Sequence, residues 1–245
     1  MNIGVYGLGR FGYFWAAILS KNFKVAAFSR NPERPVPPGV ERVSEEEVCG
    51  CGTLFLCTAI SSLNEVLPRI SPLLKPGTLV ADTCSVKVRP VKMMEAFLPS
   101  SAQILATHPM FGPDSAKTGL KGLPLVYHPV RMGPENDAYW KSYFNSLGLS
   151  VIEMTPDEHD RQAAYTQGVT HFIGRVLDDM KLEPNPIGTM GYGSLLSIIQ
   201  QTCNDPWQLF LDLQLYNPHT EEMRRKLKSS LEEIMGIISK NVSGV

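Results

Sequence analysis

The chain has 245 residues, of which 43% are hydrophobic and 19% are charged, and its 23 basic and 24 acidic residues give a formal net charge of -1. This composition is typical of a globular protein with a sizeable core, and the near-zero charge argues against nucleic acid or a membrane surface as a partner. No apolar run approaches the roughly 18 residues of a membrane span, so we expect no membrane segment and no signal peptide. The five cysteines form neither a disulfide framework nor a zinc pattern, so we expect a cytoplasmic protein with no metal.

The first half of the chain alternates short apolar runs with helical patterns. Continuous apolar runs are typical of strands that are buried on both faces of a sheet. They occur at 3–6, 24–28, 53–57, 78–81, 103–106, 124–127 and 150–153, and segments such as 13–19 and 63–74 have helical patterns between them. The alternation predicts βαβ units, and therefore an α/β fold with a doubly wound, mostly parallel sheet.

A glycine-rich turn follows the first predicted strand. Gly7-Leu8-Gly9-Arg10-Phe11-Gly12 matches G-x-G-x-x-G and precedes an apolar helix. In this context Gly7 permits a tight turn, Gly9 lets the backbone approach a pyrophosphate, and Gly12 allows the helix to pack closely on the strand. The helix N-terminus then offers N–H groups to the phosphates. We therefore predict a dinucleotide site in a Rossmann-type domain.

The end of the second strand indicates which dinucleotide binds. An NAD site usually carries an acid about 20 residues after the glycines, to bind the ribose 2′-hydroxyl. Here the strand runs into Ser29-Arg30-Asn31, with no acid at its tip. These residues suit a 2′-phosphate, so we predict NADP, the alternative being that Arg30 is a solvated loop residue. The predicted cofactor-binding residues are Gly7, Gly9, Arg10, Phe11, Gly12, Ser29, Arg30, Cys57, Thr58 and Asp82.

Two further polar segments follow neighbouring predicted strands. Asp82-Thr83-Cys84-Ser85-Val86-Lys87 follows the run at 78–81, and a segment that begins Thr107-His108-Pro109 follows the run at 103–106. Ser85 and His108 are therefore expected to open onto one crevice near a nicotinamide. There the imidazole would accept an alcohol proton while the serine orients the hydroxyl, so we predict alcohol oxidation.

Two other interpretations of Ser85 and His108 stay open at this point. A Ser–His hydrolase would need a G-x-S-x-G elbow and an acid partner, and the sequence offers neither. His108 could also serve only to cap a loop before Pro109.

The character of the chain changes near residue 155. Thr155-Pro156-Asp157-Glu158 is a typical helix start, with Thr at the N-cap and acids in the first turn. Helical patterns follow to about 181 and then at 193–203, 206–216 and 218–240, with no further strand. We therefore predict two domains, a dinucleotide-binding domain at 1–154 and a helical domain at 155–245.

Several segments together resemble the prephenate/arogenate dehydrogenase family, most of all the plant-type NADP-dependent arogenate dehydrogenases. The most specific is Thr107-His-Pro-Met-Phe-Gly-Pro-Asp114. The resemblance also includes 82–87, 121–124, 158–164, 170–171, 174–177, 191–192, 195–196 and 209–217, and so covers nearly the whole chain.

The resemblance implies the reaction and the roles of the two residues. His108 would bind and deprotonate the C4 hydroxyl of the ring, and Ser85 would hydrogen-bond the same group. Hydride would pass from C4 to NADP⁺, and loss of the ring carboxylate as CO₂ would convert arogenate to tyrosine. The alternatives are a prephenate dehydrogenase that forms 4-hydroxyphenylpyruvate and a non-catalytic NADP-binding regulator. A β-hydroxyacid dehydrogenase or ketopantoate reductase would need a catalytic Lys early in the helical half, where the first Lys is Lys181.

The helical half supplies the other predicted substrate contacts, Gln167, His171, Thr189 and Asp205. Gln167 and His171 are four residues apart and so share a helix face, although Gln167 could be an exposed polar position and His171 a core histidine. Thr189 is less typical, because Met190 stands where the plant-type pattern usually has Lys.

Asp205 bears most directly on substrate choice. Its carboxylate could pair with the ammonium of arogenate and repel the carboxylate of prephenate, or it could N-cap a helix that starts at Pro206. No Arg occurs in 195–203 to hold the ring carboxylate.

The helical half is too thin to bury its own apolar faces. Leu- and Ile-rich stretches at 195–199 and 209–215 would remain exposed in a monomer. Together with the resemblance, they predict a homodimer formed through the helical domain.

Overall fold

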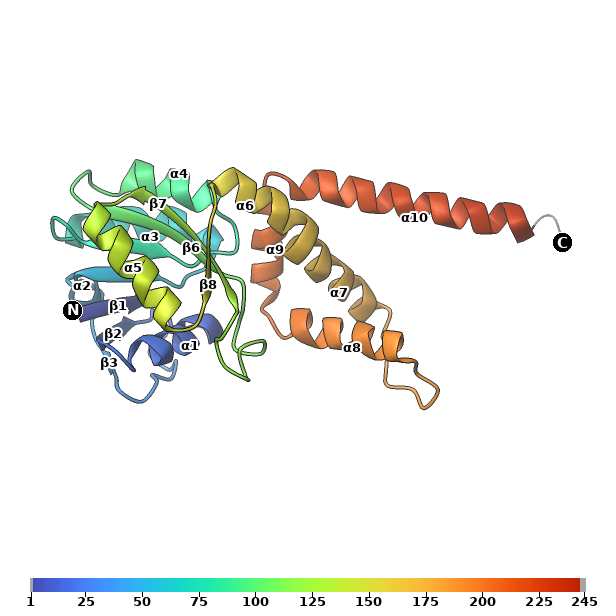
Figure 1. Cartoon of the computed structure of the whole chain (residues 1–245), viewed down its shortest axis with the longest axis horizontal. Helices are drawn as coiled ribbons and strands as arrows, with labels where there is room; N and C mark the ends of the chain where they lie inside the picture. Colours follow the sequence, from blue (N-terminus) through green and yellow to red (C-terminus); the bar gives the residue numbers. More distant parts are fainter. Residues whose placement is uncertain (1, 243–245) are drawn as a thin grey trace. The chain divides into compact units, whose positions relative to one another are not determined.

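A computed structural model describes residues 2–242 of the chain. The chain divides into two compact units, one ending at His159 and one beginning at Asp160. The division falls within the first helix of the helical half, a few residues after the boundary that the sequence suggests. Figure 1 shows a sheet with helices in the first unit and helices alone in the second.

The first unit is built on one eight-stranded sheet, with the order β3-β2-β1-β4-β5-β6-β7-β8. Every neighbouring pair is parallel except β6 and β7, which are antiparallel. This confirms the predicted mostly parallel α/β fold. The strands are β1 (Asn2–Tyr6), β2 (Lys24–Phe28), β3 (Val40–Arg42), β4 (Thr53–Leu56), β5 (Leu79–Asp82), β6 (Gln103–Pro109), β7 (Pro124–Arg131) and β8 (Ser150–Glu153).

Helices cover both faces of this sheet. They are α1 (Arg10–Leu19), α2 (Glu45–Cys49), α3 (Leu63–Ile70), α4 (Val88–Phe97) and α5 (Pro134–Ser146), with short 3₁₀ turns η1 (Ile60–Ser62) and η2 (Ser71–Leu73). Trp15 of α1 packs on Phe55 of β4 and on Phe144 of α5, with ring centroids 5.9 and 6.1 Å apart. Gly4 of β1 lies against α2 on the opposite face, where a Cβ would come within 2.6 Å of the Val48 carbonyl oxygen.

Three strands differ from the sequence prediction. β7 runs to Arg131, beyond the predicted end at residue 127, because its pairing with β6 continues to Ile104. β3 was not predicted because its three residues are partly or fully exposed and carry no apolar run. β6 extends to Pro109, beyond the predicted end at residue 106, because antiparallel pairing with β7 continues past the end of β5.

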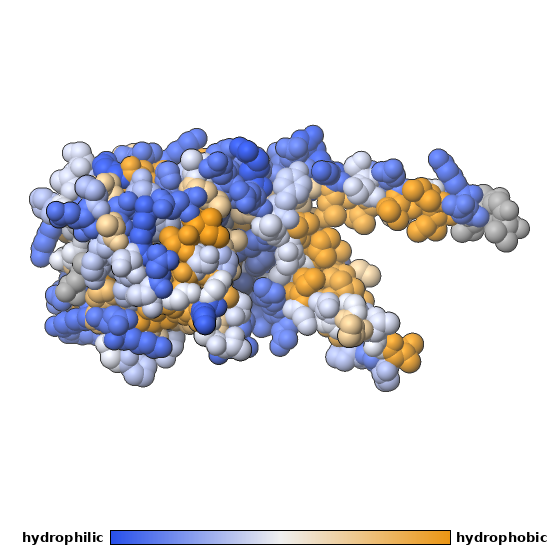
Figure 2. All heavy atoms as spheres, viewed as in Figure 1, coloured by the Kyte–Doolittle hydropathy of each residue, from blue (hydrophilic) through white to orange (hydrophobic). Residues whose placement is uncertain are grey.

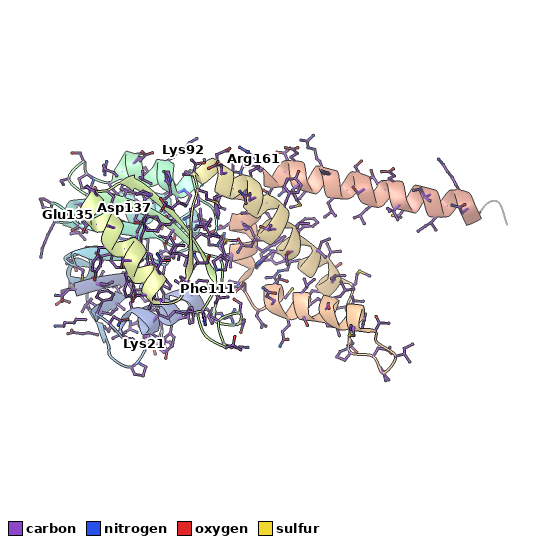
Figure 3. The ribbon with its side chains drawn as sticks, in the orientation of Figure 1. Lys21, Lys92, Phe111, Glu135, Asp137 and Arg161 are labelled. Carbon is purple, nitrogen blue, oxygen red and sulfur yellow. The ribbon has the colours of Figure 1, made fainter. Side chains whose placement is uncertain are left out.

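The hydroxyl of Tyr127 on β7 donates to Asp137 of α5, 2.9 Å away, and Figure 3 labels this helix at Asp137.

The second unit is all helical. After α6 (Pro156–Ala163), which starts in the first unit, come η3 (Ala164–Gly168), α7 (Val169–Asp179), α8 (Met190–Cys203), α9 (Trp207–Tyr216) and α10 (Thr220–Val242). The predicted helix start holds, because Thr155 and Glu158 exchange side-chain to backbone hydrogen bonds of 2.9 and 3.3 Å. The predicted single helix to 181 is interrupted by η3, a π-helical turn.

Within this unit the helices pack closely at a few positions. A Cβ on Gly174 of α7 would come within 2.0 Å of Thr202 Oγ1 on α8. The Gln214 amide of α9 donates to the Gly168 carbonyl at 2.8 Å, and the Asn217 amide donates to the Asp160 carbonyl at 2.7 Å.

Among residues 2–242, no helix combines the length and apolar character that crossing a membrane requires.

Candidate active site

The glycine-rich turn between β1 and α1 has the geometry that dinucleotide binding requires. Gly7 has φ +108, and a Cβ on Gly12 would lie 1.9 Å from the Gly7 carbonyl oxygen. Gly9 is the N-cap of α1, and a Cβ there would meet nothing within 4 Å. The turn therefore leaves open space at the helix N-terminus, where a pyrophosphate would fit.

Two side chains of this turn make protein contacts. Arg10 donates to Asp114 Oδ2 at 2.6 Å, and this bond and Lys117 lower the pKa of the Asp114 carboxyl. Phe11 stacks on Trp15 at a centroid distance of 5.7 Å, so its ring belongs to the aromatic core next to the site. The cofactor roles of Arg10 and Phe11 stay predictions.

Ser29 and Arg30 directly follow β2, as predicted for residues near an adenosine ribose. Arg30 is exposed, and its guanidinium lies 3.7 Å from Glu65 of α3. An ion pair that is this long and this exposed contributes little, so the Arg30 guanidinium can exchange Glu65 for a phosphate.

The predicted residues Cys57 and Thr58 come at the carboxyl end of β4. The Thr83 hydroxyl donates to the Leu56 carbonyl at 2.9 Å and to Cys57 Sγ at 3.6 Å, and burial raises the pKa of the Cys57 thiol to about 12. The thiol is therefore protonated and unreactive at neutral pH. Thr58 Oγ1 is buried and has no hydrogen-bond partner among residues 2–242.

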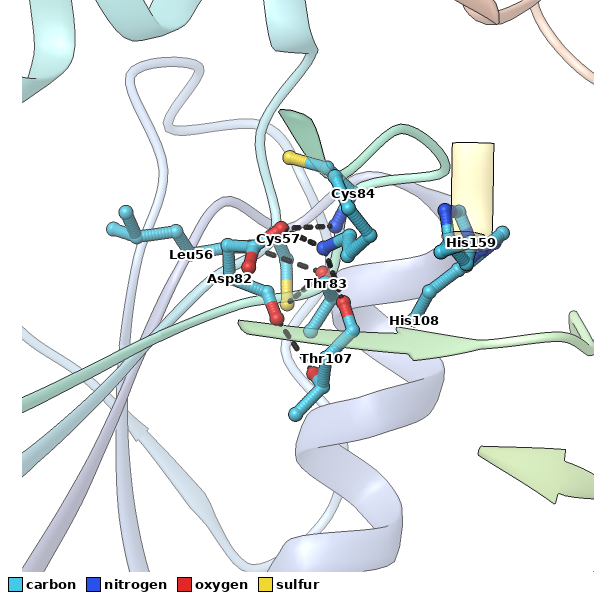
Figure 4. Close-up of polar contacts among 9 residues, drawn as sticks. Leu56, Cys57, Asp82, Thr83, Cys84, Thr107, His108 and His159 are labelled. Atoms are coloured by element: carbon cyan, nitrogen blue, oxygen red, sulfur yellow. Dashed lines mark hydrogen bonds and ion pairs between the residues drawn. The ribbon is translucent and has the colours of Figure 1, made fainter. Parts of the chain in front are cut away.

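Asp82, the last residue of β5, holds the segment that follows β5 next to β6. Its carboxylate pairs with Lys87 and accepts the Cys84 N–H at 3.0 Å, while Lys87 also donates to the Thr107 carbonyl at 2.6 Å (Figure 4). Both charged side chains are fully buried. Asp82 therefore fixes the loop that carries Ser85, and direct contact with a cofactor stays a prediction.

Ser85 lies in the loop after β5, and His108 lies near the end of β6, the neighbouring parallel strand. Ser85 lies three residues beyond Asp82, which pairs with Ala106 two residues before His108. Both residues are buried, and Ser85 Oγ has no hydrogen-bond partner within the described part of the chain. An unpaired buried hydroxyl is costly, so it is best explained by a ligand that completes its bonding.

His108 lies within β6 and not in the loop after it, which corrects the interpretation that it only caps a loop. Its Nδ1 is 2.8 Å from Nε2 of His159, and the two rings meet edge to face (Figure 4). The sequence carries no signal that pairs His159 with His108, because 51 residues separate the two histidines.

Gln167 and His171 lie in the helical unit around the π-turn. Gln167 is in η3 with its Oε1 buried and without a partner among residues 2–242, so it is not the exposed position that the alternative supposed. Burial, then the charge of Arg175, lowers the pKa of His171 to about 4. The π-turn changes the helical repeat after Gln167, so the four-residue spacing does not by itself place the two on one face.

Thr189 and Asp205 flank α8. Thr189 is exposed and N-caps this helix, accepting the Tyr192 N–H at 3.2 Å. The next helix, α9, has Pro206 at its N-cap position, so Asp205 lies one residue before that position. Arg175 of α7 donates to the Asp205 carbonyl at 2.7 Å and lies over the Trp207 ring, which fixes the segment. The substrate contacts of Thr189 and Asp205 stay predictions.

Comparison with protein families identifies two regions of the chain. Residues 39–153 match the nucleotide-binding domain of prephenate dehydrogenase, and residues 176–244 match the TYRAAT1-like C-terminal domain. In residues 2–242, no group of three or more His, Cys, Asp or Glu side chains is placed to hold a metal ion.

Two plant proteins resemble the chain over most of its length. It is 36% identical to arogenate dehydrogenase 1, chloroplastic, of Arabidopsis thaliana over 96% of the chain and 38% of that protein. It is 34% identical to arogenate dehydrogenase 2, chloroplastic, of the same plant over 96% of the chain and 69% of that protein. The chain therefore spans about two fifths of the first relative and about two thirds of the second.

The fold is similar to that of a solved prephenate dehydrogenase. The crystal structure of the A. aeolicus enzyme, in complex with hydroxyphenyl propionate and NAD⁺, matches with a TM-score of 0.78 at 18% identity. The match covers 99% of this chain and 92% of that chain. At this identity the likeness concerns the fold alone.

Proposed function

Since the chain belongs to the prephenate/arogenate dehydrogenase family, we propose that it converts arogenate to tyrosine by oxidative decarboxylation, with NADP⁺ as hydride acceptor. The observation that carries this proposal is the placement of Ser85 just after β5 and of His108 near the carboxyl end of β6, the neighbouring strand, at the same edge of the sheet as the glycine-rich turn after β1. The unpartnered buried hydroxyl of Ser85 supports a ligand at that position.

The proposed reaction removes a hydride from the ring carbon that bears the hydroxyl. The nicotinamide, when bound, supplies the hydride acceptor. The bond to the ring carboxylate breaks as CO₂ leaves, and its electron pair completes the aromatic ring. Atoms and charge balance, because arogenate and NADP⁺ give tyrosine, CO₂ and NADPH, and the hydroxyl proton returns to the phenol oxygen.

Ser85 and His108 act on the hydroxyl group in this scheme. Ser85 hydrogen-bonds the oxygen and orients it, and His108 holds the proton at Nε2 while the hydride leaves. A base that accepts this proton places electron density on the oxygen, which drives hydride loss. Gln167, His171 and Thr189 are proposed to contact the substrate, and Asp205 to pair with its ammonium group.

NADP is proposed over NAD because of the residues that follow the end of β2. Ser29 and the exposed Arg30 suit a 2′-phosphate, and neither position carries an acid that would repel it. The open space at Gly9 and the unpartnered Thr58 hydroxyl support a dinucleotide along the same edge. Gly7, Gly12 and Asp82 shape this edge, with Arg10, Phe11 and Cys57 beside it.

We further propose that the chain acts as a homodimer through its helical domain, residues 155–245. The supporting observation is the set of exposed apolar side chains on α7, α8 and α10, and Figure 2 shows apolar surface over α7 and along one side of α10. A cytoplasmic location and the absence of nucleic-acid and membrane partners stay predictions, and the two plant relatives are described as chloroplastic.

A crossed assay tests the proposal. NADPH or NADH formation at 340 nm is followed with arogenate and with prephenate, each with NADP⁺ and with NAD⁺. We expect the highest kcat/KM for arogenate with NADP⁺. His108→Ala should lose most of its turnover and still bind NADPH. A preference for prephenate would replace the substrate, and NADPH binding without turnover of either compound would favour a regulator.

A further inference from the structure

The two buried histidines of the first unit form a pair whose geometry restricts how His108 can be protonated. His108 Nδ1 and His159 Nε2 are 2.8 Å apart, which is hydrogen-bond distance between ring nitrogens. The ring centroids are 5.0 Å apart and the ring planes meet at 70°, so the two rings are not stacked and come together at an edge. His108 and His159 are 3% and 2% exposed, respectively, so bulk water does not compete for this contact.

The backbone holds both members of the pair in place. His108 lies in β6, where it is in register with Val126 of β7. His159 lies in the first turns of α6, where its N–H donates to the Thr155 carbonyl at 3.0 Å. The start of α6 is fixed in turn by the reciprocal hydrogen bonds of Thr155 and Glu158. The pair therefore joins a strand to a capped helix, and neither ring is on a loop.

A hydrogen bond between two neutral imidazoles needs one donor and one acceptor. If His159 donated from Nε2, then His108 would accept at Nδ1 and carry its own proton on Nε2, where it could not act as a base. If His108 donates from Nδ1, its Nε2 keeps a lone pair that can accept a proton. Only the second arrangement is compatible with the part that His108 plays in the proposed reaction.

We propose that His159 is a positioning residue that holds His108 in its Nδ1–H tautomer by accepting that proton in a hydrogen bond. The proposal rests on the proposed function for its catalytic consequence, whereas the tautomer itself is a property of the protein alone. When His108 takes a proton, its Nδ1–H becomes a stronger donor to His159 Nε2, so the pair stabilises the charged ring.

A neutral partner suits the chemistry of the proposed substrate. Many catalytic histidines are oriented by a carboxylate, which also stabilises the imidazolium. Arogenate brings its own ring carboxylate, on the ring carbon across from the one that bears the hydroxyl. A neutral imidazole fixes the tautomer of His108 without adding a second negative charge to a site that must also hold that carboxylate.

Two variants separate the hydrogen bond from the shape of the side chain. His159→Gln keeps an acceptor near the position of Nε2, and His159→Phe keeps a planar ring but has no acceptor. We expect His159→Phe to lower kcat for arogenate by about 100-fold or more. The KM for arogenate and the affinity for NADPH should stay within about twofold, and His159→Gln should retain kcat within about tenfold of the unchanged chain.

Nitrogen-15 NMR of the imidazole rings in the full chain measures the tautomer without any substrate. The chain has five histidines, and loss of a signal in His108→Gln assigns His108. We expect Nδ1–H for His108 in the unchanged chain and in His159→Gln, and a mixture with Nε2–H in His159→Phe.

The two measurements distinguish the failure of this inference from failure of the proposed function. An Nε2–H tautomer in the unchanged chain overturns the inference whether or not either variant folds. Equal losses of kcat in the Gln and Phe variants, or a tautomer that ignores both, overturn it as well. If neither substrate turns over while the tautomer of His108 depends on His159, the proposed function fails and the positioning role stands.

Discussion

The proposed preference for NADP⁺ over NAD⁺ depends on Arg30. An Arg–phosphate bond contributes about 1.5–3 kcal/mol, because a charged group donates to a charged acceptor. Arg30→Ala should therefore raise the KM for NADP⁺ by about 10- to 100-fold and leave the KM for NAD⁺ unchanged. Steady-state kinetics with both cofactors measures this, and Arg34→Ala, an exposed arginine in the same loop, is the matched control. Equal losses with both cofactors would contradict a 2′-phosphate contact.

The proposed preference for arogenate over prephenate depends on Asp205. Asparagine keeps the size of the side chain but cannot pair with an ammonium group as strongly, and it does not repel a carboxylate. We expect Asp205→Asn to lower the ratio of kcat/KM for arogenate to that for prephenate by about 10- to 100-fold. The exposed Asp179→Asn at the end of α7 serves as the control. A ratio that does not change in Asp205→Asn would exclude this carboxylate as the selector.

His171 gives the stability a defined pH dependence. Burial and Arg175 lower its pKa to about 4, whereas the ordinary value is about 6.5. As pH falls, His171 is protonated in the unfolded chain before it is protonated in the folded chain. The stability that neutral His171 gives to the folded chain is therefore complete above pH about 6.5 and is lost toward pH 4. The difference corresponds to about 3 kcal/mol. Urea unfolding at several pH values should show a weaker pH dependence in His171→Gln than in His219→Gln, and equal dependence would contradict the shift.

The individual residues also show where sequence analysis was insufficient. His108 was identified as functional from its position near a strand end, but its partner His159 was not. His108 is in register with Val126, and Val126 with Ile152 of β8, so the chain returns to the level of His108 just before α6 begins. This register depends on the antiparallel pairing of β7, which no local pattern indicates.

Among the elements, the contact of α7 with α8 depends on a missing side chain. A methyl group on Gly174 would overlap Thr202 Oγ1 at 2.0 Å, so Gly174→Ala must push the two helices apart. Overpacking of this kind costs about 1–3 kcal/mol, and chemical denaturation measures it. Gly193→Ala on α8 is the control, because its Cβ would meet nothing within 4 Å and Ala favours a helix by about 1 kcal/mol.

The relief of the overlap provides a second check. Adding Thr202→Ala to Gly174→Ala removes the overlapping hydroxyl, so the double variant should lose less stability than the sum of the single variants. Additive losses would mean that the packing of α7 on α8 does not decide the effect.

Most elements were predictable because their signals are local. Apolar runs located the seven longer strands, and Thr155 with Pro156 located the start of α6. β3 gave no signal, since it is short and exposed, and it forms only because β2 offers an edge. The π-turn η3 was also missed, because no local pattern in 164–168 distinguishes a π-turn from an ordinary turn of α-helix.

At the scale of the whole molecule, the loss of strand patterns after residue 153 predicts a helical domain from residue 155, and the structure divides into two compact units between His159 and Asp160. The apolar stretches at 195–199 and 209–215 suggest a dimer in the sequence, but Leu213 is fully buried. The longer exposed series is on α10, at Leu231, Ile234, Met235, Ile237 and Ile238, where each residue is 52–65% exposed. The mixture of charged and apolar residues in this helix concealed the series in the linear sequence.

These α10 residues predict what holds two copies together. In a twofold interface each side chain is buried twice, and burial of one Ile contributes about 1.5–3 kcal/mol. Replacing Ile234 and Ile238 by Glu should therefore weaken the dimer by about 6 kcal/mol or more and give monomers at micromolar concentration. Light scattering measures the mass, and circular dichroism checks that the helices persist. Ser229→Glu, on the opposite side of α10, should remain dimeric, and an unchanged chain that is already monomeric at this concentration would contradict the proposed assembly.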